Sequence, residues 1–142
     1  MKNLLFILSV LFYSSLAVAQ HINEKDVPDT VKATFSKKFP NQKNVKWEKE
    51  KENYEASFSI EKSEHAVVID SKGSLIETEE EISVKELPAN AIAYIQKNYS
   101  DKKIKEAAKI TNATGIVTFE AKVGSKDLIF DKTGSYIKTT AD

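Results

Sequence analysis

The sequence predicts an α+β fold built as a tandem repeat, in which each unit is one helix followed by a four-stranded antiparallel sheet. Two observations predict it. Apolar residues first recur with the period of a helix and then with a period of two, and this change occurs twice along the chain. An Asp-x-x-Gly signal, at Asp70 and again at Asp131, falls between the last two apolar runs of each unit. The expected units span about residues 27–82 and 87–142.

Residues 1–19 are expected to be a signal peptide. A basic start precedes the apolar run LLFILSVLFYSSL, and Ala17 and Ala19 occupy the two positions that a signal peptidase reads. A membrane anchor is the alternative, but the run is shorter than the roughly 20 apolar residues that a spanning helix needs. Cleavage between Ala19 and Gln20 predicts a periplasmic or secreted domain over residues 20–142, with no membrane anchor.

Each unit is expected to begin with a helix. Three apolar residues spaced four apart form one face of each helix: Val31, Phe35 and Phe39 in the first, and Ala91, Ile95 and Tyr99 in the second. Pro28 and Pro88 suit the start of a helix, because the missing N–H has no partner there and the proline ring sets a helical φ. We therefore expect both helices to pack through these apolar faces.

After each helix the alternation of apolar and polar residues predicts strands with one apolar and one polar face. Two shorter strands close each unit: His65–Asp70 and Ser74–Glu79, then Asp127–Asp131 and Ser135–Thr139. The polar positions define a sheet face that a partner could contact: Lys46, Glu48, Glu55, Ser57, Ser59, Thr118, Glu120 and Lys122. A wet face with cross-strand Lys–Glu pairs is the alternative, and the sequence alone favours it.

Two further features have competing interpretations. The run Glu77-Thr78-Glu79-Glu80-Glu81 is interpreted as a solvated connector that ends the first unit, with ordinary carboxyl pKa values, and an acidic docking patch is the alternative. Trp47, the single tryptophan, shares its apolar face with Val45. Core packing under the helix is favoured for Trp47, and an interface aromatic is the alternative.

Several motifs together resemble the PepSY-like, β-lactamase-inhibitor-like proteins, which are small exported proteins of the Bacteroidetes. They are Val-Pro-x-x-Val-Lys-x-x-Phe-x-x-Lys-Phe-Pro over residues 27–40, Val-Lys-Trp over 45–47, Tyr-Glu-Ala-x-Phe over 54–58, Asp-x-x-Gly over 70–73 and Leu-Pro over 87–88. The resemblance implies two units side by side, whose sheets form one curved surface with helices on its convex side. It also implies, by analogy, a protein that binds or restrains an exported enzyme. No residue here matches an inhibitory loop, and the chain lacks the cysteines of β-lactamase inhibitor disulfides.

The composition and motifs argue against most other chemistry. With no cysteine, two separated histidines (His21 and His65) and four dispersed glycines, the chain has no pattern for zinc, a nucleophilic triad or a phosphate-binding loop. Asp70 and Asp131 are expected to shape turns, because lysines stand where calcium would need further carboxylates. Arginine, the preferred reader of phosphates and base edges, is absent, which disfavours nucleic acid as a partner.

The sequence therefore predicts a non-catalytic exported binding module with no metal or cofactor. Its expected partner is an exported protein or peptide, such as an extracytoplasmic enzyme that it engages or inhibits. The alternative is a small-ligand or envelope-stress binding protein with a site between the two repeats. The oligomeric state is left open.

Overall fold

A single antiparallel sheet of nine strands forms the framework of the computed structural model, which describes residues 20–141. Neighbouring strands follow one another in sequence order from β1 to β9. The strands are β1 (Gln20–Ile22), β2 (Lys46–Glu50), β3 (Asn53–Ile60), β4 (Ser63–Asp70), β5 (Leu75–Ile82), β6 (Ile104–Asn112), β7 (Val117–Val123), β8 (Lys126–Asp131) and β9 (Tyr136–Ala141). Helix α1 (Asp29–Lys38) and helix α2 (Ala89–Asn98) are each preceded by a short 3-10 turn, η1 (Glu24–Asp26) and η2 (Val84–Glu86). The predicted signal peptide and Ala19 lie outside the described residues.

The predicted tandem of two units, each a helix plus a four-stranded sheet, is wrong. β5 and β6 pair over Glu77–Ile82 and Ala107–Asn112, so one hydrogen-bond ladder crosses the expected boundary between the units. β1 adds a ninth strand before α1 by pairing with β2. Alternation reveals strands but not which distant strands pair, and three residues of β1 are too few to show a period.

The interpretation of residues 77–81 as a solvated connector is also wrong. These residues belong to β5, the strand that joins the two halves of the sheet because it pairs with β4 on one side and β6 on the other. Glu79 is only 5% exposed. Glutamate has a low strand propensity, so the composition of this segment does not indicate a strand. Pairing with β4 and β6 makes it a central strand all the same.

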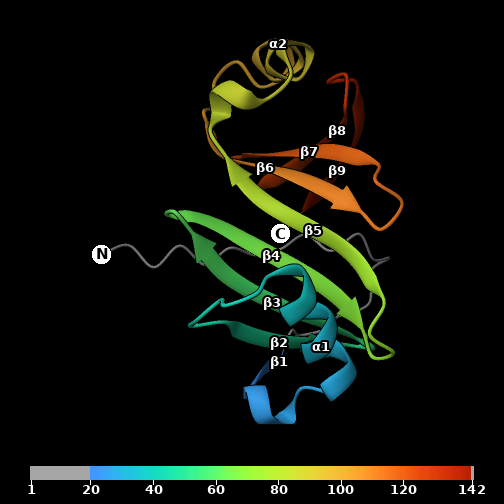
Figure 1. Ribbon diagram of the computed structural model, residues 1–142. Coiled ribbons are helices and arrows are strands. Elements are labelled where there is room, and N and C mark those ends of the chain that lie inside the picture. The colour runs from blue at the N-terminus through green and yellow to red at the C-terminus, as the bar shows by residue number, and fades with distance from the viewer. Residues whose placement is uncertain (1–19, 142) are drawn as a thin grey trace.

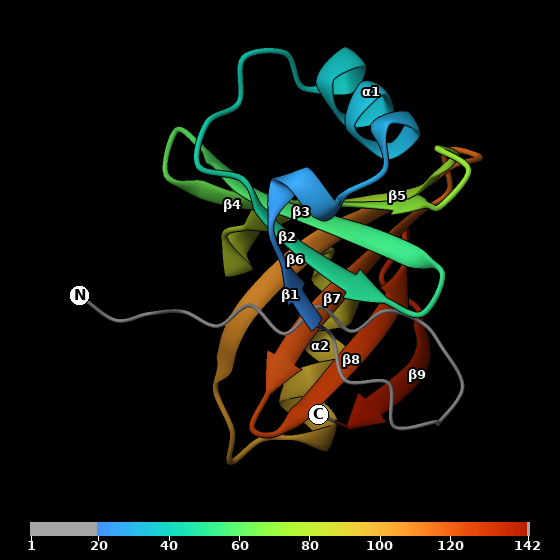
Figure 2. The ribbon, with the colours of Figure 1, turned by 90° about the horizontal axis from the view of Figure 1, so that it is seen from below.

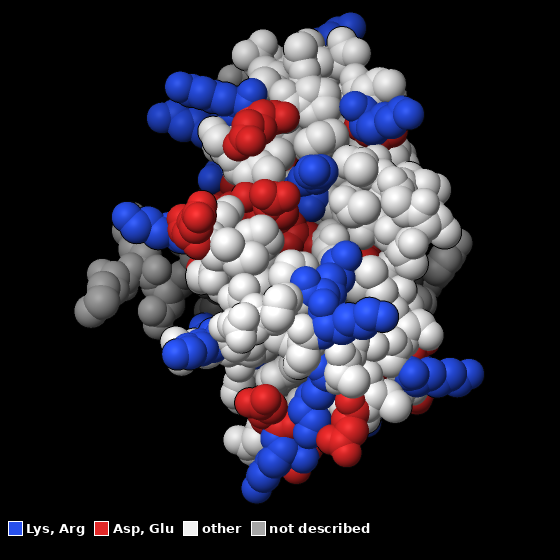
Figure 3. Space-filling view, in the orientation of Figure 1, with Lys and Arg blue, Asp and Glu red and all other residues white. Residues whose placement is uncertain are grey.

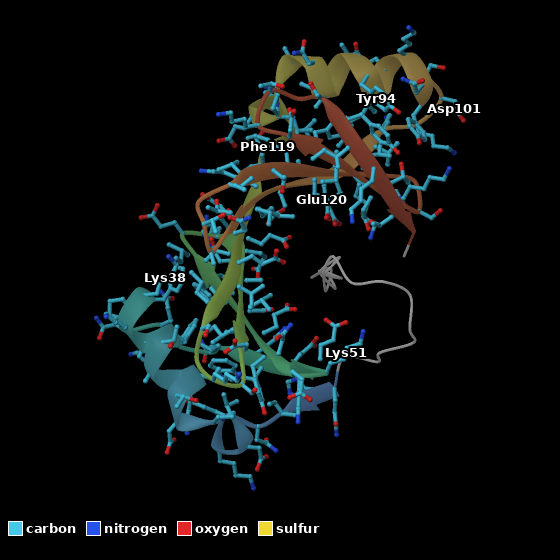
Figure 4. The ribbon with its side chains drawn as sticks, turned by 90° about the vertical axis from the view of Figure 1, so that its right-hand side faces the viewer. Lys38, Lys51, Tyr94, Asp101, Phe119 and Glu120 are labelled. Atoms are coloured by element: carbon cyan, nitrogen blue, oxygen red, sulfur yellow. The ribbon has the colours of Figure 1, made fainter. Side chains whose placement is uncertain are left out.

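Both helices pack on the same face of the sheet (Figure 1), α1 over the first half and α2 over β6–β9 (Figure 2). The sheet bends so that the helices lie on its outer side (Figure 4). Under α1, the Phe35 ring meets Trp47 edge-on at 5.3 Å and Phe58 at 5.2 Å between ring centroids. Under α2, Ile95 packs with Leu128 and Phe130 in a second cluster.

The two Asp-x-x-Gly segments are turns, as the sequence predicts. Oδ1 of Asp70 accepts hydrogen bonds from the backbone N–H groups of Lys72 (2.9 Å) and Ser74 (2.8 Å). Oδ1 of Asp131 accepts equivalent bonds from Thr133 (2.8 Å) and Ser135 (2.9 Å). The backbone bond from Ser74 is the main cause that holds the pKa of Asp70 below its usual range, and the hydrogen bond from the Thr133 hydroxyl, followed by the backbone bond from Ser135, does the same for Asp131. Each carboxylate thus stabilises the turn between two strands and has its acceptor capacity used locally.

Candidate functional site

The sheet face opposite the helices, called here the inner face, carries the polar residues singled out from the sequence. Directly opposed residues in a ladder share a face, and Lys46 stands opposite Ser57 while Glu48 stands opposite Glu55. By the same register, the expected partner-binding residues all lie on the inner face: Lys46, Glu48, Glu55, Ser57, Ser59, Thr118, Glu120 and Lys122. Trp47 points to the other side, where it is 2% exposed in the core.

The inner face has an apolar floor that alternation within single strands does not reveal. Small and β-branched residues follow one another across the middle strands and are all buried: Ala66, Val68, Ala108, Ile110 and Ile129. Both helices lie on the other face, so these side chains belong to neither helix-covered core cluster. The inner face is therefore a mixture of apolar floor and charged side chains, and not the wholly polar face expected from β3 and β7.

Glu79 stands in the middle of this floor. In the ladder it lies between Ala66 of β4 and Ile110 of β6, both buried. Its Oε1 is buried and has no hydrogen-bond partner in the part of the chain that the structure describes. A buried carboxyl oxygen without a partner costs free energy, roughly 1–3 kcal/mol for an unsatisfied polar group. Proteins retain such costs mainly where a site needs the group.

Four other carboxyl groups raise the pKa of Glu79 further, in addition to the burial that is its main cause. They are Glu120, Glu55, Glu77 and Asp127, in that order of effect. They come from β3, β5, β7 and β8, so the sheet brings together acids from both halves of the chain. Glu120 and Asp127 are themselves buried, and Figure 4 shows Glu120 on the inner side of the bend, with Lys38 of α1 on the outer side.

Glu55 is the second perturbed acid of the inner face. Its carboxylate accepts a hydrogen bond from the Ser57 hydroxyl at 3.0 Å, and Glu48 stands directly opposite it. Burial raises the pKa of Glu55 to about 7, the serine hydrogen bond lowers it, and the charges of Glu48, Glu50 and Glu77 raise it. Burial likewise raises the pKa of Glu77. Like charges placed side by side destabilise a sheet, so this arrangement is not explained by folding.

These raised pKa values predict that the protein loses stability as the pH rises. The folded state holds the Glu55 proton up to about pH 7, whereas the unfolded chain releases it near 4.5. Stability from this group is therefore complete below about pH 4.5 and is lost between there and about pH 7. Urea unfolding at pH 4.5 and 7.5 should show a fall of about 1–3 kcal/mol, given 1.36 kcal/mol per pKa unit and partial exposure.

Glu55→Gln should reduce this dependence, because the variant has no proton to lose at that position. Glu80→Gln is the matched control, since Glu80 is exposed and lies on the helix side of β5 opposite His65. Glu80→Gln should keep the wild-type dependence of the free energy of unfolding on pH. A stability that rises between pH 4.5 and 7 in the wild type would contradict the assigned burial of the inner-face acids.

Other surfaces of the described chain offer less. A hollow of about 420 Å³ near the junction of the two halves is lined by charged and polar residues around Lys62, Glu81 and Glu86. A second, of about 320 Å³, lies between α1 and the following loop. Within residues 20–141 no group of three His, Cys, Asp or Glu side chains is arranged to hold a metal ion. Figure 3, the side that bears α1, shows lysine and acidic side chains interspersed.

Comparison with known proteins identifies the family. The sequence matches the family model described as "Putative beta-lactamase-inhibitor-like, PepSY-like" twice, over residues 17–77 and 67–138. The chain belongs to this family. No curated protein matches the sequence.

Solved structures share the fold. A BLIP-like protein from Bacteroides fragilis is 21% identical with a TM-score of 0.65, and the alignment covers 80% of this chain and 85% of that one. A structure from Bacteroides eggerthii, described as one of its "putative periplasmic proteins", gives 16% identity, a TM-score of 0.74, and 81% and 88% coverage. A DUF2874 family protein from Bacteroides uniformis is 18% identical with a TM-score of 0.72, and the alignment covers 80% of this chain and 88% of that one. This protein therefore has a BLIP-like fold.

Proposed function

We propose that this PepSY-like protein is a non-catalytic module of the bacterial envelope that binds an exported protein through the inner face of its sheet. The observation that carries the proposal is the composition of that face. A floor of buried apolar residues surrounds acids whose burial and mutual repulsion work against folding. A cluster of buried acids of this kind is typical of a functional site, because selection for stability alone would replace the acids.

Export is part of the proposal. The apolar start of the sequence, with small residues at 17 and 19, is typical of a signal peptide. Structures that share the fold include one described as periplasmic, from Bacteroides eggerthii. Among the described residues, no helix combines the length and the apolar character needed to cross a membrane.

A protein partner fits better than a small ligand held between the two halves of the chain. Sites for drug-sized ligands are mostly apolar and enclosed. The hollow near the junction is open and lined instead by charged side chains such as Glu80 and Glu86. The inner face, by contrast, extends over the middle strands of the sheet and carries polar and charged side chains around its buried apolar floor, which suits contact with an extended surface.

Affinity capture with a blocked inner face tests the proposal. Residues 20–142 are immobilised and exposed to a Bacteroides envelope extract, and bound proteins are quantified by mass spectrometry. Ser57→Trp places a bulky side chain on the inner face beside Ala66, and Glu80→Trp places the same side chain on the exposed helix side of β5. We expect the wild type and Glu80→Trp to capture the same protein in similar amounts. Ser57→Trp should capture at least about tenfold less of it.

Two outcomes would contradict the proposal. The wild type could enrich nothing over a blank support, or Ser57→Trp could retain as much as Glu80→Trp. Circular dichroism and thermal unfolding of both variants exclude a loss caused by misfolding.

A further inference from the structure

We propose that the inner face recognises a positively charged side chain, a lysine or arginine of the partner, and that Glu79 is the residue that pairs with it. The inference deepens the proposed function and rests on it. It assigns the chemistry of the occupant: a protein segment that presents one cation between small apolar residues.

Charge distribution is the first step. The whole chain is balanced, with 21 Lys plus Arg and 21 Asp plus Glu. The inner face is not balanced, because acids outnumber the lysines that the register places there. The inner-face acids of the central strands include Glu55, Glu77, Glu79, Glu81, Glu106, Glu120 and Asp127, against Lys46, Lys122 and Lys138. Complementary charge steers and fixes partners, so this face favours a cation.

The unpartnered oxygen of Glu79 is the second and independent step. Glu79 is 5% exposed, and its Oε1 has no hydrogen-bond partner among the described residues. A lysine ammonium carries three donors and an arginine guanidinium five. Either group would satisfy Oε1 and neutralise the carboxylate, and hydrogen bonds between charged groups are the strong ones.

The floor around Glu79 distinguishes a protein segment from a free cation. Ala66 and Ile110 flank Glu79 directly, and Val68 and Ala108 lie one step further along β4 and β6. These side chains offer only apolar contact. A metal ion gains nothing from them, whereas the aliphatic stem of a lysine side chain and the residues beside it in the partner would bury against them. Residues 20–141 also lack a metal-binding group.

Cation binding at this place has a consequence for protons. Burial and the surrounding acids raise the pKa of Glu79, so this carboxyl keeps its proton to a higher pH than an ordinary glutamate, and pairing with an ammonium favours release of that proton. The charged groups that act on it are Glu120, Glu55, Glu77 and Asp127, and the register also places Lys46 and Lys122 on the inner face. Affinity should therefore rise with pH, by up to about tenfold per unit for each proton released.

The test uses a defined probe, the capped pentapeptide acetyl-Ala-Val-Lys-Val-Ala-amide, titrated into isotopically labelled residues 20–142 and followed by backbone amide shifts. The matched probe carries Nε-acetyl-lysine, which keeps the stem and removes the charge. We expect the lysine peptide to shift amides around residues 66, 79 and 110, and the acetylated peptide to bind at least about tenfold more weakly. Between pH 5.5 and 7.5 the affinity for the lysine peptide should rise.

Two variants assign the effect to Glu79. Glu79→Gln should weaken binding of the lysine peptide about tenfold or more, because it leaves the cation without a carboxylate. Glu80→Gln removes the adjacent charge from the other face of β5 and should change binding less than about twofold. Glu79→Gln keeps the size of the side chain, so the fold should be unchanged. The same amide spectra verify this.

The inference is overturned if the lysine peptide does not bind, if the acetylated peptide binds equally well, or if both variants behave alike. Its failure is distinguishable from failure of the proposed function. Loss of the captured protein in Ser57→Trp but not in Glu79→Gln would leave inner-face binding intact and refute the cation. Retention of the captured protein in Ser57→Trp would refute the binding face itself.

Discussion

Phe130→Ala should lower the free energy of unfolding by about 3–5 kcal/mol, the usual cost of deleting a buried aromatic ring. Phe130 is fully buried on β8 beneath α2. Its ring meets Tyr94 at 5.7 Å and Tyr136 at 6.2 Å between centroids, both nearly edge-on. The substitution therefore leaves a cavity and also removes two aromatic contacts. Since small domains are stable by about 5–15 kcal/mol, the loss is a large fraction of the total.

Chemical denaturation of residues 20–142 measures this effect. Ile116→Ala is the control, because Ile116 is 62% exposed in the turn between β6 and β7. It should change stability by less than about 0.5 kcal/mol. A loss for Phe130→Ala as small as that of Ile116→Ala would mean that α2 does not pack on β8 as described.

Gly134→Ala should destabilise the protein by about 2–4 kcal/mol, combining backbone strain with overpacking. Gly134 has φ +83°, a conformation that costs an L-residue about 1–2 kcal/mol. An added Cβ would also lie 2.7 Å from the backbone nitrogen of Ala91 and 2.8 Å from the Cβ of Pro88. The turn after Asp131 lies directly against the start of α2, so the first turn of α2 would have to move.

Gly115→Ala separates the two causes. Gly115 has the same φ of +83°, yet nothing lies within 4 Å of its Cβ position. This variant should therefore show only the strain, about 1–2 kcal/mol, in the same denaturation experiment. Equal losses at the two glycines would contradict the close approach between the turn after β8 and the start of α2.

The sequence predicts local structure well where one strong physical signal decides it. Val31 and Phe35 at helical spacing do lie buried on α1, and the turn at Asp70 forms through the hydrogen bonds expected of aspartate before glycine. Pairing between the halves was not predictable in this way. The contact of β5 with β6 depends on residues some thirty positions apart, and no pattern within either strand encodes it.

The candidate site was half predictable. Glu55 and Glu120 lie at polar positions of alternating strands, so the sequence places them on one face. Glu79 was missed because five consecutive polar residues read as solvated. Its signal was present in the spacing of Glu77, Glu79 and Glu81, which puts all three on one side of a strand. Only the register with Ala66 and Ile110 reveals that this side is buried.

Binding through the inner face would explain why destabilising acids persist in a chain that has no cysteine and therefore no disulfide to stabilise its fold. Burial raises the pKa of Glu55 to about 7, and burial together with the neighbouring acids raises the pKa of Glu79 well above its ordinary value. A partner that supplies a cation would recover the cost of their burial, because a paired buried charge is far less costly than an unpaired one. Stability and recognition are thus expected to oppose one another at the same residues.

Site-specific photocrosslinking tests the central claim, that the partner contacts the inner face, most directly. The chain has no cysteine, so Ser57→Cys and Glu80→Cys each introduce a unique thiol for a benzophenone maleimide. The two positions lie on opposite faces of one sheet. Irradiation in a Bacteroides envelope extract should give a discrete adduct from position 57 and none from position 80. An adduct formed only from position 80, or none from either, would contradict the account.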